Sequence, residues 1–149
     1  MRTKTKTIMM VVCFALGLVA NVSPAFSAQQ QHDPGGKTHQ AIPATAGEIL
    51  TAVDTLLADL DKTIAAKALD KVHVTAFAIR DLLLALPEKT GAMPAEGKKA
   101  LGASLGKIKQ QAGLLDKYGD AGDLAQTTAV FAKFKEEVAK IKQMPGLQP

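Results

Sequence analysis

Two histidines and an aspartate near the N-terminus are the side chains of this sequence best suited to holding a metal ion. His32, Asp33 and His39 place two imidazoles and a carboxylate in one short stretch. Imidazole nitrogen and carboxylate oxygen are ligands for divalent transition metals such as copper, zinc and nickel. The stretch is polar and rich in glycine and proline, so ordering it around an ion costs chain entropy and predicts weak binding. The alternative is a solvated leader that holds the rest of the chain away from its surroundings.

His73 is the remaining histidine, and it lies in an apolar part of the sequence. Facing a neighbouring helix, it could bind a metal, ligate haem or form a pH-sensitive contact. The alternative is a packed or half-exposed side chain bonded to a neighbour. Haem is not expected, because Met93 and Met144 fall in a loop and near the C-terminus, where neither is well placed opposite His73. The paired Glu-x-x-His ligands of di-metal helical bundles do not occur.

The densest acidic cluster is formed by Asp116, Asp120 and Asp123. Their oxygens suit calcium, but the spacing is not that of an EF-hand loop, and no glutamate closes it at the required position. We expect Asp120 or Asp123 to cap a helix instead. The sequence also lacks a nucleophile elbow, a catalytic-triad spacing and a specific acid–base pair of carboxylates. It therefore predicts a protein that is not an enzyme.

The first 27 residues have the layout of a secretory signal peptide. A basic start, an uncharged apolar run and an end with small side chains occupy residues 1–6, 8–20 and 23–28. Cleavage is expected after Ser27 or after Ala28. The alternative is an uncleaved anchor, but the run is shorter than the ~20 apolar residues that span a bilayer. We therefore expect a periplasmic or secreted protein with no stable membrane insertion after cleavage.

Cleavage would change both the thiol content and the charge of the chain. The single cysteine, Cys13, lies inside the apolar run, so the mature chain has no thiol for disulfides, thiolate metal sites or cysteine-linked haem. The full chain has 18 basic and 14 acidic residues, a net charge of +4. Without Arg2, Lys4 and Lys6, 15 basic residues remain against 14 acidic ones, a net charge of +1. With 1 tyrosine, no tryptophan and no basic stripe, nucleic-acid binding is not expected.

The mature chain divides into a tail, a helical domain and a short C-terminal tail, over residues 28–44, 45–144 and 145–149. In the domain, apolar residues recur at spacings of three and four, which predicts amphipathic helices. Four helices are expected, over residues 46–67, 70–86, 94–118 and 123–143. Two short connections and one longer loop, over residues 87–93, favour an all-α fold: an antiparallel up-down four-helix bundle.

Local signals place the helix ends. Thr45 and Glu48 match the S/T-x-x-E capping box at the start of the first helix. Asp70 is the expected N-cap of the second helix. The third helix carries several glycines, each costing about 1 kcal/mol relative to alanine. Two of them, Gly102 and Gly106, lie four apart on one face, where they permit a close helix crossing or simply make this helix the most mobile.

Three segments carry a resemblance to a known group of proteins. Residues 69–73 read LDKVH, residues 76–82 read AFAIRDL with a Leu-Pro pair at 86–87, and residues 119–123 read GDAGD. This combination resembles a group of uncharacterised small secreted helical proteins of Gram-negative bacteria. The resemblance implies an envelope role in metal resistance, beside heavy-metal efflux systems, and places His73 at the group's helix-start histidine. Histidine-rich tails are common in that group, whereas this tail has only His32 and His39, so strong metal capture is not expected.

Two functional hypotheses follow. The first is a periplasmic accessory protein in which the tail ligands, with His73, transiently hold copper, zinc or nickel for an efflux partner. The second is a ligand-free interaction module whose helical face contacts an envelope partner or another copy of the same chain. The tail distinguishes them, because deleting residues 28–44 should abolish the first activity and spare the second.

Overall fold

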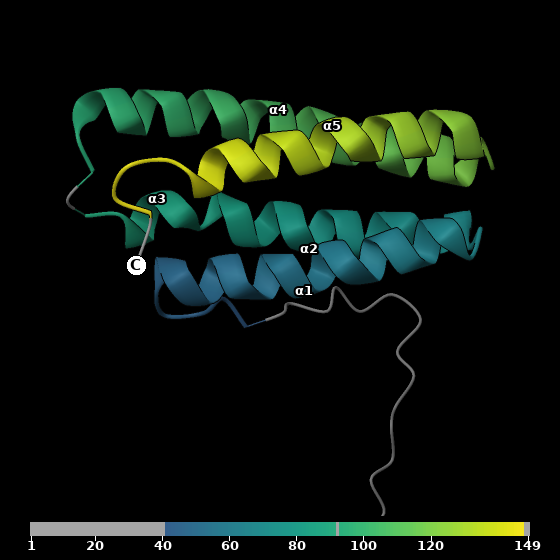
Figure 1. Cartoon of the computed structure of the whole chain (residues 1–149), viewed down its shortest axis with the longest axis horizontal. Coiled ribbons are helices and arrows are strands. Elements are labelled where there is room, and N and C mark those ends of the chain that lie inside the picture. The colour runs from purple at the N-terminus through teal and green to yellow at the C-terminus, as the bar shows by residue number, and fades with distance from the viewer. Residues whose placement is uncertain (1–40, 92, 148–149) are drawn as a thin grey trace, which may run out of the picture. The chain divides into compact units, whose positions relative to one another are not determined.

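The computed structural model describes residues 41–91 and 93–147, and the regular structure in these ranges is entirely helical. This confirms the all-α prediction. The long helices α1, α2, α4 and α5 cover Ala46–Ala65, Val72–Leu84, Ala95–Asp120 and Leu124–Lys142 (Figure 1). A 3-10 turn, η1 (Leu69–Lys71), precedes α2, and a short helix, α3 (Leu86–Lys89), follows it. The expected signal peptide over residues 1–27 and the expected tail as far as residue 40 lie outside the described residues.

The start of α1 is fixed by the capping box expected from the sequence. The Glu48 amide donates a hydrogen bond to the Thr45 hydroxyl oxygen at 3.2 Å, and the Thr45 amide donates one to a Glu48 carboxylate oxygen at 3.0 Å. Both amides thereby gain partners that the helix itself cannot supply. The helix ends at Ala65, and Lys67 then adopts a left-handed backbone with a φ of 57°. The chain turns at this point toward α2.

The expected N-cap at Asp70 is wrong. Asp70 lies inside η1, α2 begins at Val72, and the residue before it, Lys71, makes no side-chain cap. The 3-10 turn supplies backbone bonds instead, since the Lys71 amide donates to the carbonyl of Ala68 at 3.1 Å. A helix that continues from such a turn needs no capping side chain at its first residue.

The connection between α2 and α4 contains one turn of helix where a loop was expected. Pro87 sits at the start of α3, a position where a missing amide costs no helical hydrogen bond. Leu86 is fully buried and anchors this turn to the core. α4 then begins at Ala95, directly after Pro94.

Close approach along α4 occurs at a different glycine from the two expected. A Cβ added at Gly102 or at Gly106 would meet no atom within 4 Å, so neither glycine lies at a helix crossing within the described part of the chain. At Gly119 an added Cβ would lie 2.7 Å from the carbonyl oxygen of Leu69. Real Cβ atoms do not approach an oxygen so closely, so the contact between η1 and the end of α4 requires glycine.

The core is built mainly from aliphatic side chains on the seams that the apolar spacing predicted. The largest fully buried side chains are Ile49, Val53, Leu60, Ile79, Leu82, Leu83, Leu86, Leu101, Ile108, Leu115, Phe134 and Ile141. Burying one such side chain contributes about 1.5–3 kcal/mol. Across residues 41–91 and 93–147, no helix is at once long enough and apolar enough to cross a membrane.

Long helices that follow one another along the chain also pack against one another. α1 packs on α2, α2 on α4 and α4 on α5 (Figure 1). α1 also meets α5 over a smaller contact. Two ion pairs join these last two helices, Lys135 to Asp61 at 3.2 Å and Lys142 to Asp54 at 2.6 Å.

Candidate metal centre

Three potential metal ligands from two helices come together where α2 begins and α4 ends. His73 on α2 and Asp116 and Asp120 on α4 each offer one ligand atom, and these atoms all lie within 4.8 Å of one another. Asp116 and Asp120 are four residues apart, so they project from the same face of their helix. Since α2 packs directly on α4, that face meets the first turn of α2. The arrangement is a candidate site for a divalent ion.

The fold positions this cluster through the backbone contact at Gly119. Because Gly119 lacks a side chain, the Leu69 carbonyl approaches α4 one residue before Asp120. Leu69 itself is buried, and Val72 beside it is fully buried. His73 follows directly, so its imidazole starts from a fixed piece of backbone.

The distance between two side chains of the cluster, those of His73 and Asp120, is too long for a hydrogen bond. His73 Nδ1 lies 4.0 Å from Asp120 Oδ1, beyond hydrogen-bond range. Zinc holds nitrogen and oxygen ligands at about 2.0–2.1 Å, which sets two ligands of a tetrahedral ion about 3.3 Å apart. The Asp120 side chain is 65% exposed, so it is free to rotate and to shorten the distance between the two ligand atoms from 4.0 Å toward that of a zinc site.

The Nδ1 atom of His73 is buried although its side chain as a whole is 39% exposed. Among the residues described, Nδ1 finds no hydrogen-bond partner. A buried polar atom without a partner loses its bond to water and gains none in return, which costs about 1–3 kcal/mol. A metal ion would supply that missing interaction.

An aromatic side chain and a cation follow His73 along α2. Its ring centroid is 6.4 Å from that of Phe77, with the planes tilted by 59°. The Arg80 guanidinium lies over the Phe77 ring at 4.3 Å and donates from Nε to the Asp81 carboxylate at 2.8 Å. The Arg80 guanidinium is thus engaged by Phe77 and Asp81 of its own helix.

Asp123, the third member of the acidic cluster seen in the sequence, has a structural role. Its carboxylate accepts a hydrogen bond from the Gln126 amide at 3.0 Å and caps α5. The prediction of an N-cap at Asp120 or Asp123 is thus confirmed at Asp123. Asp120 is instead the last residue of α4, where its carboxylate remains available to the cluster.

Sequence reasoning named His73 but not its partners. It grouped Asp116 and Asp120 with Asp123, their neighbour along the chain, and considered calcium for them. One signal in the sequence does indicate the cluster. Asp116 and Asp120 are four residues apart, so they share a face of their helix, and this helix follows the helix of His73 in the chain. The other predicted ligands, His32, Asp33 and His39, lie outside the described residues.

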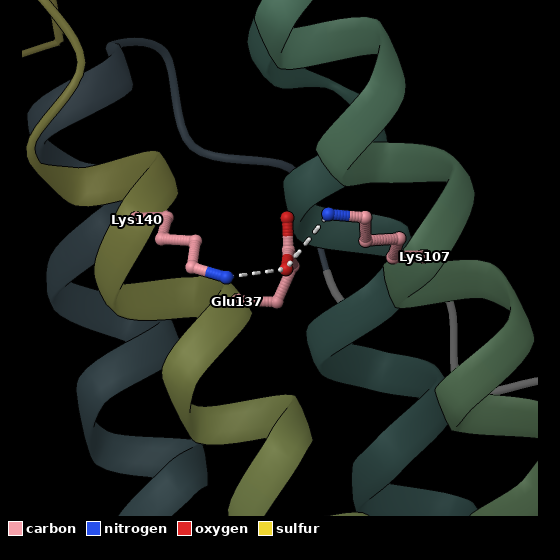
Figure 2. Close-up of polar contacts among 3 residues, drawn as sticks. All are labelled: Lys107, Glu137 and Lys140. Atoms are coloured by element: carbon pink, nitrogen blue, oxygen red, sulfur yellow. Dashed lines mark hydrogen bonds and ion pairs between the residues drawn. The ribbon is translucent and has the colours of Figure 1, made fainter.

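A second polar feature lies between α4 and α5, where Glu137 is almost completely buried. Figure 2 shows its carboxylate between Lys107 and Lys140, whose ammonium groups lie 3.5 and 3.4 Å from Oε2. The other oxygen, Oε1, is buried and has no hydrogen-bond partner among the described residues. Burial raises the pKa of the Glu137 carboxyl, but the nearby Ser104 hydroxyl and the charges of Lys140 and Lys107 outweigh it, so the pKa is lowered. Glu137 is therefore ionised at neutral pH, and its contacts within the fold make it a structural group.

A shallow groove of about 360 Å³ runs between α1 and α5. Its apolar lining includes Ile64, Leu124 and Phe131. The ion pair between Asp61 and Lys135 lies at its rim, with the Lys135 ammonium 4.5 Å from the centre of the Phe131 ring. The groove has room for a side chain of a partner protein, but it brings together no catalytic or metal-binding set.

Comparison of the chain with protein-family models, with curated proteins and with solved structures gives no match.

Proposed function

We propose that this protein is a non-enzymatic accessory protein of the periplasm that binds a divalent transition metal, such as copper, zinc or nickel. His73 is the principal ligand, with Asp116 and Asp120 beside it. The observation that carries the proposal is the convergence of these three ligand atoms within 4.8 Å. The buried Nδ1 of His73, which has no hydrogen-bond partner among the described residues, supports it further.

The chemistry of the ligands selects the class of metal. One imidazole and two carboxylates form a nitrogen–oxygen set, which suits zinc, nickel and Cu²⁺. Calcium takes six to eight oxygen ligands and is poorly served by an imidazole. With its single cysteine at position 13, inside the proposed signal peptide, the mature chain brings no thiolate. Binding is expected to be weak because only three protein ligands converge.

Export to the envelope forms part of the same proposal. The signal-peptide layout of residues 1–27 supports it, as does the resemblance to secreted proteins linked with metal efflux. We also propose that the long helices form an antiparallel up-down bundle, supported by the short connections and by the packing of consecutive helices. The tail ligands His32, Asp33 and His39 would form a second, weaker site.

Calorimetry on the protein purified after export tests the metal proposal. Titration with Zn²⁺, Ni²⁺ and Cu²⁺ should give millimolar or tighter binding for at least one ion. The variant His73→Ala should lose about tenfold or more in affinity for that ion. The matched control is Asp70→Asn, which removes one exposed carboxylate from η1, outside the cluster. The proposal fails if none of the ions gives heat, or if His73→Ala binds as tightly as the control.

The tail is tested separately. If residues 28–44 bind metal on their own, the pair His32→Ala and His39→Ala should remove a second binding event and leave the His73 site intact. Loss of all binding in that double variant would place the main site in the tail and contradict the assignment to His73.

The second candidate function is an interaction module that contacts an envelope partner or another copy of the chain. The groove between α1 and α5 favours it, because the apolar residues Ala65, Leu124 and Ala132 of its lining are at least partly exposed to solvent. The change Ala132→Glu, at an exposed residue of the groove lining, would weaken an interaction made through this groove and leave metal binding unchanged. A protein that stays monomeric at high concentration and captures no envelope protein would count against this function.

A further inference from the structure

The number of ligands at the proposed metal centre has a consequence for what else binds there. Three described residues contribute, with one ligand atom each. The next carboxylate along the chain after Asp120, that of Asp123 at the start of α5, is engaged with the Gln126 amide. Zinc takes four ligands in closed structural sites, and its open sites keep a position for an outside ligand. A three-ligand centre therefore leaves at least one coordination position unfilled by the described chain.

The unfilled position faces outward. The Asp120 side chain is 65% exposed and the His73 side chain 39% exposed, so both form the outer rim of the cluster. Asp116, more buried than Asp120, lies one turn further into the domain. Because Nδ1 of His73 is itself buried, an ion bound to it would be open to solvent on the side of the exposed Asp120 carboxylate. A small molecule or a side chain of another protein could reach it from the solvent side.

Charge favours a neutral nitrogen donor at that position. Two ionised carboxylates balance the two positive charges of a divalent ion, so the occupied centre carries no net charge. An anionic fourth ligand would make the centre negative, whereas an imidazole would not. Nitrogen donors are also strong ligands for zinc, nickel and Cu²⁺.

Soft ligands do not compete for this position. The two methionines of the described chain, Met93 and Met144, lie near the start of α4 and after the end of α5. Asp116 and Asp120 are at the opposite end of α4. The centre is thus suited to divalent ions and not to Cu⁺, which prefers thiolate and thioether sulfur.

We infer that this centre holds its divalent ion as an open ternary complex, in which His73, Asp116 and Asp120 bind one side and an imidazole from outside the domain completes the coordination. The inference rests on the proposed function. The imidazole is that of a histidine on another molecule. An ion held in this way can pass to a partner through a shared intermediate, because the partner's histidine binds before the first three ligands release.

Cobalt provides the test, because Co²⁺ replaces zinc and its visible absorption depends on its coordination. The exported protein is dialysed against Co²⁺ with and without free imidazole, and protein-free dialysis corrects for cobalt bound by imidazole alone. Imidazole at about ten times its own dissociation constant should lower the apparent Kd for cobalt about tenfold. The absorption spectrum should change with the same concentration dependence. Asp116→Asn with Asp120→Asn should abolish both effects, while Asp70→Asn should preserve them.

The variant His32→Ala with His39→Ala distinguishes the sources of the imidazole. An equal response to free imidazole in this variant and in the unaltered protein supports a donor from another molecule. A response that appears only in the variant assigns the fourth ligand to the chain's own tail and overturns an open centre.

Two other outcomes separate the inference from the proposed function. If cobalt binds and depends on His73, but imidazole leaves the spectrum unchanged or strips the ion, the ternary complex is refuted and metal binding stands. If cobalt, zinc and nickel all fail to bind, the proposed function fails and the inference with it.

Discussion

Replacing Glu137 with glutamine tests whether the buried carboxylate stabilises the contact between α4 and α5 through its charge. The change keeps the size of the side chain and one oxygen for the lysines, and it removes the negative charge. Glu137 is 4% exposed, and its Oε2 lies 3.5 Å from Lys107 and 3.4 Å from Lys140. Because the pKa of the carboxyl is lowered in spite of burial, the attractions outweigh the cost of burying the charge.

The size of the effect follows from the exposure of the lysines. Two unit charges about 3.5 Å apart attract by about 5 kcal/mol at an effective dielectric constant of 20. Both lysine side chains are more than half exposed, so water screens much of this attraction. Exposed pairs contribute about 0.2–1 kcal/mol each. Glu137→Gln removes two such attractions, but burying a neutral amide costs less than burying a charged carboxylate. We therefore expect Glu137→Gln to lower the free energy of unfolding by about 1 kcal/mol at neutral pH.

The effect should depend on pH in a defined direction. A carboxyl whose pKa is lowered in the folded protein adds stability above its ordinary pKa, and this share is lost as the pH falls through the folded pKa. Below that point Glu137 is protonated and resembles glutamine. The difference between the unaltered protein and Glu137→Gln should therefore shrink as the pH falls below the ordinary range of a glutamate carboxyl.

Urea denaturation followed by far-UV circular dichroism, at neutral pH and at a series of lower pH values, measures both quantities. The matched control is Glu136→Gln, which makes the same change at an exposed neighbour and should shift stability by less than about 0.5 kcal/mol. Glu137→Leu also removes the unpartnered Oε1, so we expect it to be more stable than Glu137→Gln by about 1 kcal/mol. The reasoning is refuted if Glu137→Gln is as stable as the control at neutral pH, or if Glu137→Leu is the least stable of the three.

The remaining predictions concern helix ends and glycines, read from the same denaturation assay. Gly119→Ala should lower the free energy of unfolding by about 1–3 kcal/mol, because its Cβ would lie 2.7 Å from the Leu69 carbonyl oxygen. Gly102→Ala, where a Cβ meets nothing within 4 Å, should raise the free energy of unfolding by about 1 kcal/mol. Equal stabilities of the Gly119 and Gly102 variants would contradict the close approach at Gly119. Asp123→Ala should lower the free energy of unfolding by about 1 kcal/mol through loss of the hydrogen bond from the Gln126 amide, whereas Asp123→Asn should retain most of this stabilisation.

Much of the helical architecture could be predicted from local patterns. The capping box at Thr45 and Glu48 involves residues three apart, so its hydrogen bonds depend on nothing outside one turn. Apolar spacing likewise predicted the buried seams, because the helical period alone decides which residues share a face. The failure at Asp70 has the same origin. An acidic residue before an apolar run looks like an N-cap, and the sequence does not reveal that a 3-10 turn supplies backbone partners instead.

The metal cluster and the glycine contact depend on how two helices meet. Asp116 and Asp120 share a face by their spacing, but their proximity to His73 depends on the relative shift of α2 and α4. That shift is set by the approach of Leu69 to Gly119. Gly102, Gly106 and Gly119 are all glycines of α4, and no local property of the sequence shows which of them makes a close contact. Such a contact requires the packed structure.

The two ion pairs between α1 and α5 bear on the order in which the domain folds. They join residues 74 and 88 positions apart, Asp61 to Lys135 and Asp54 to Lys142. Consecutive long helices, by contrast, pack after short connections, so their contacts form with little loss of loop entropy. Proteins rich in such local contacts fold within microseconds to milliseconds. We therefore expect neighbouring helices to pair first and the contact between α1 and α5 to close last, as the step that joins the two ends of the domain.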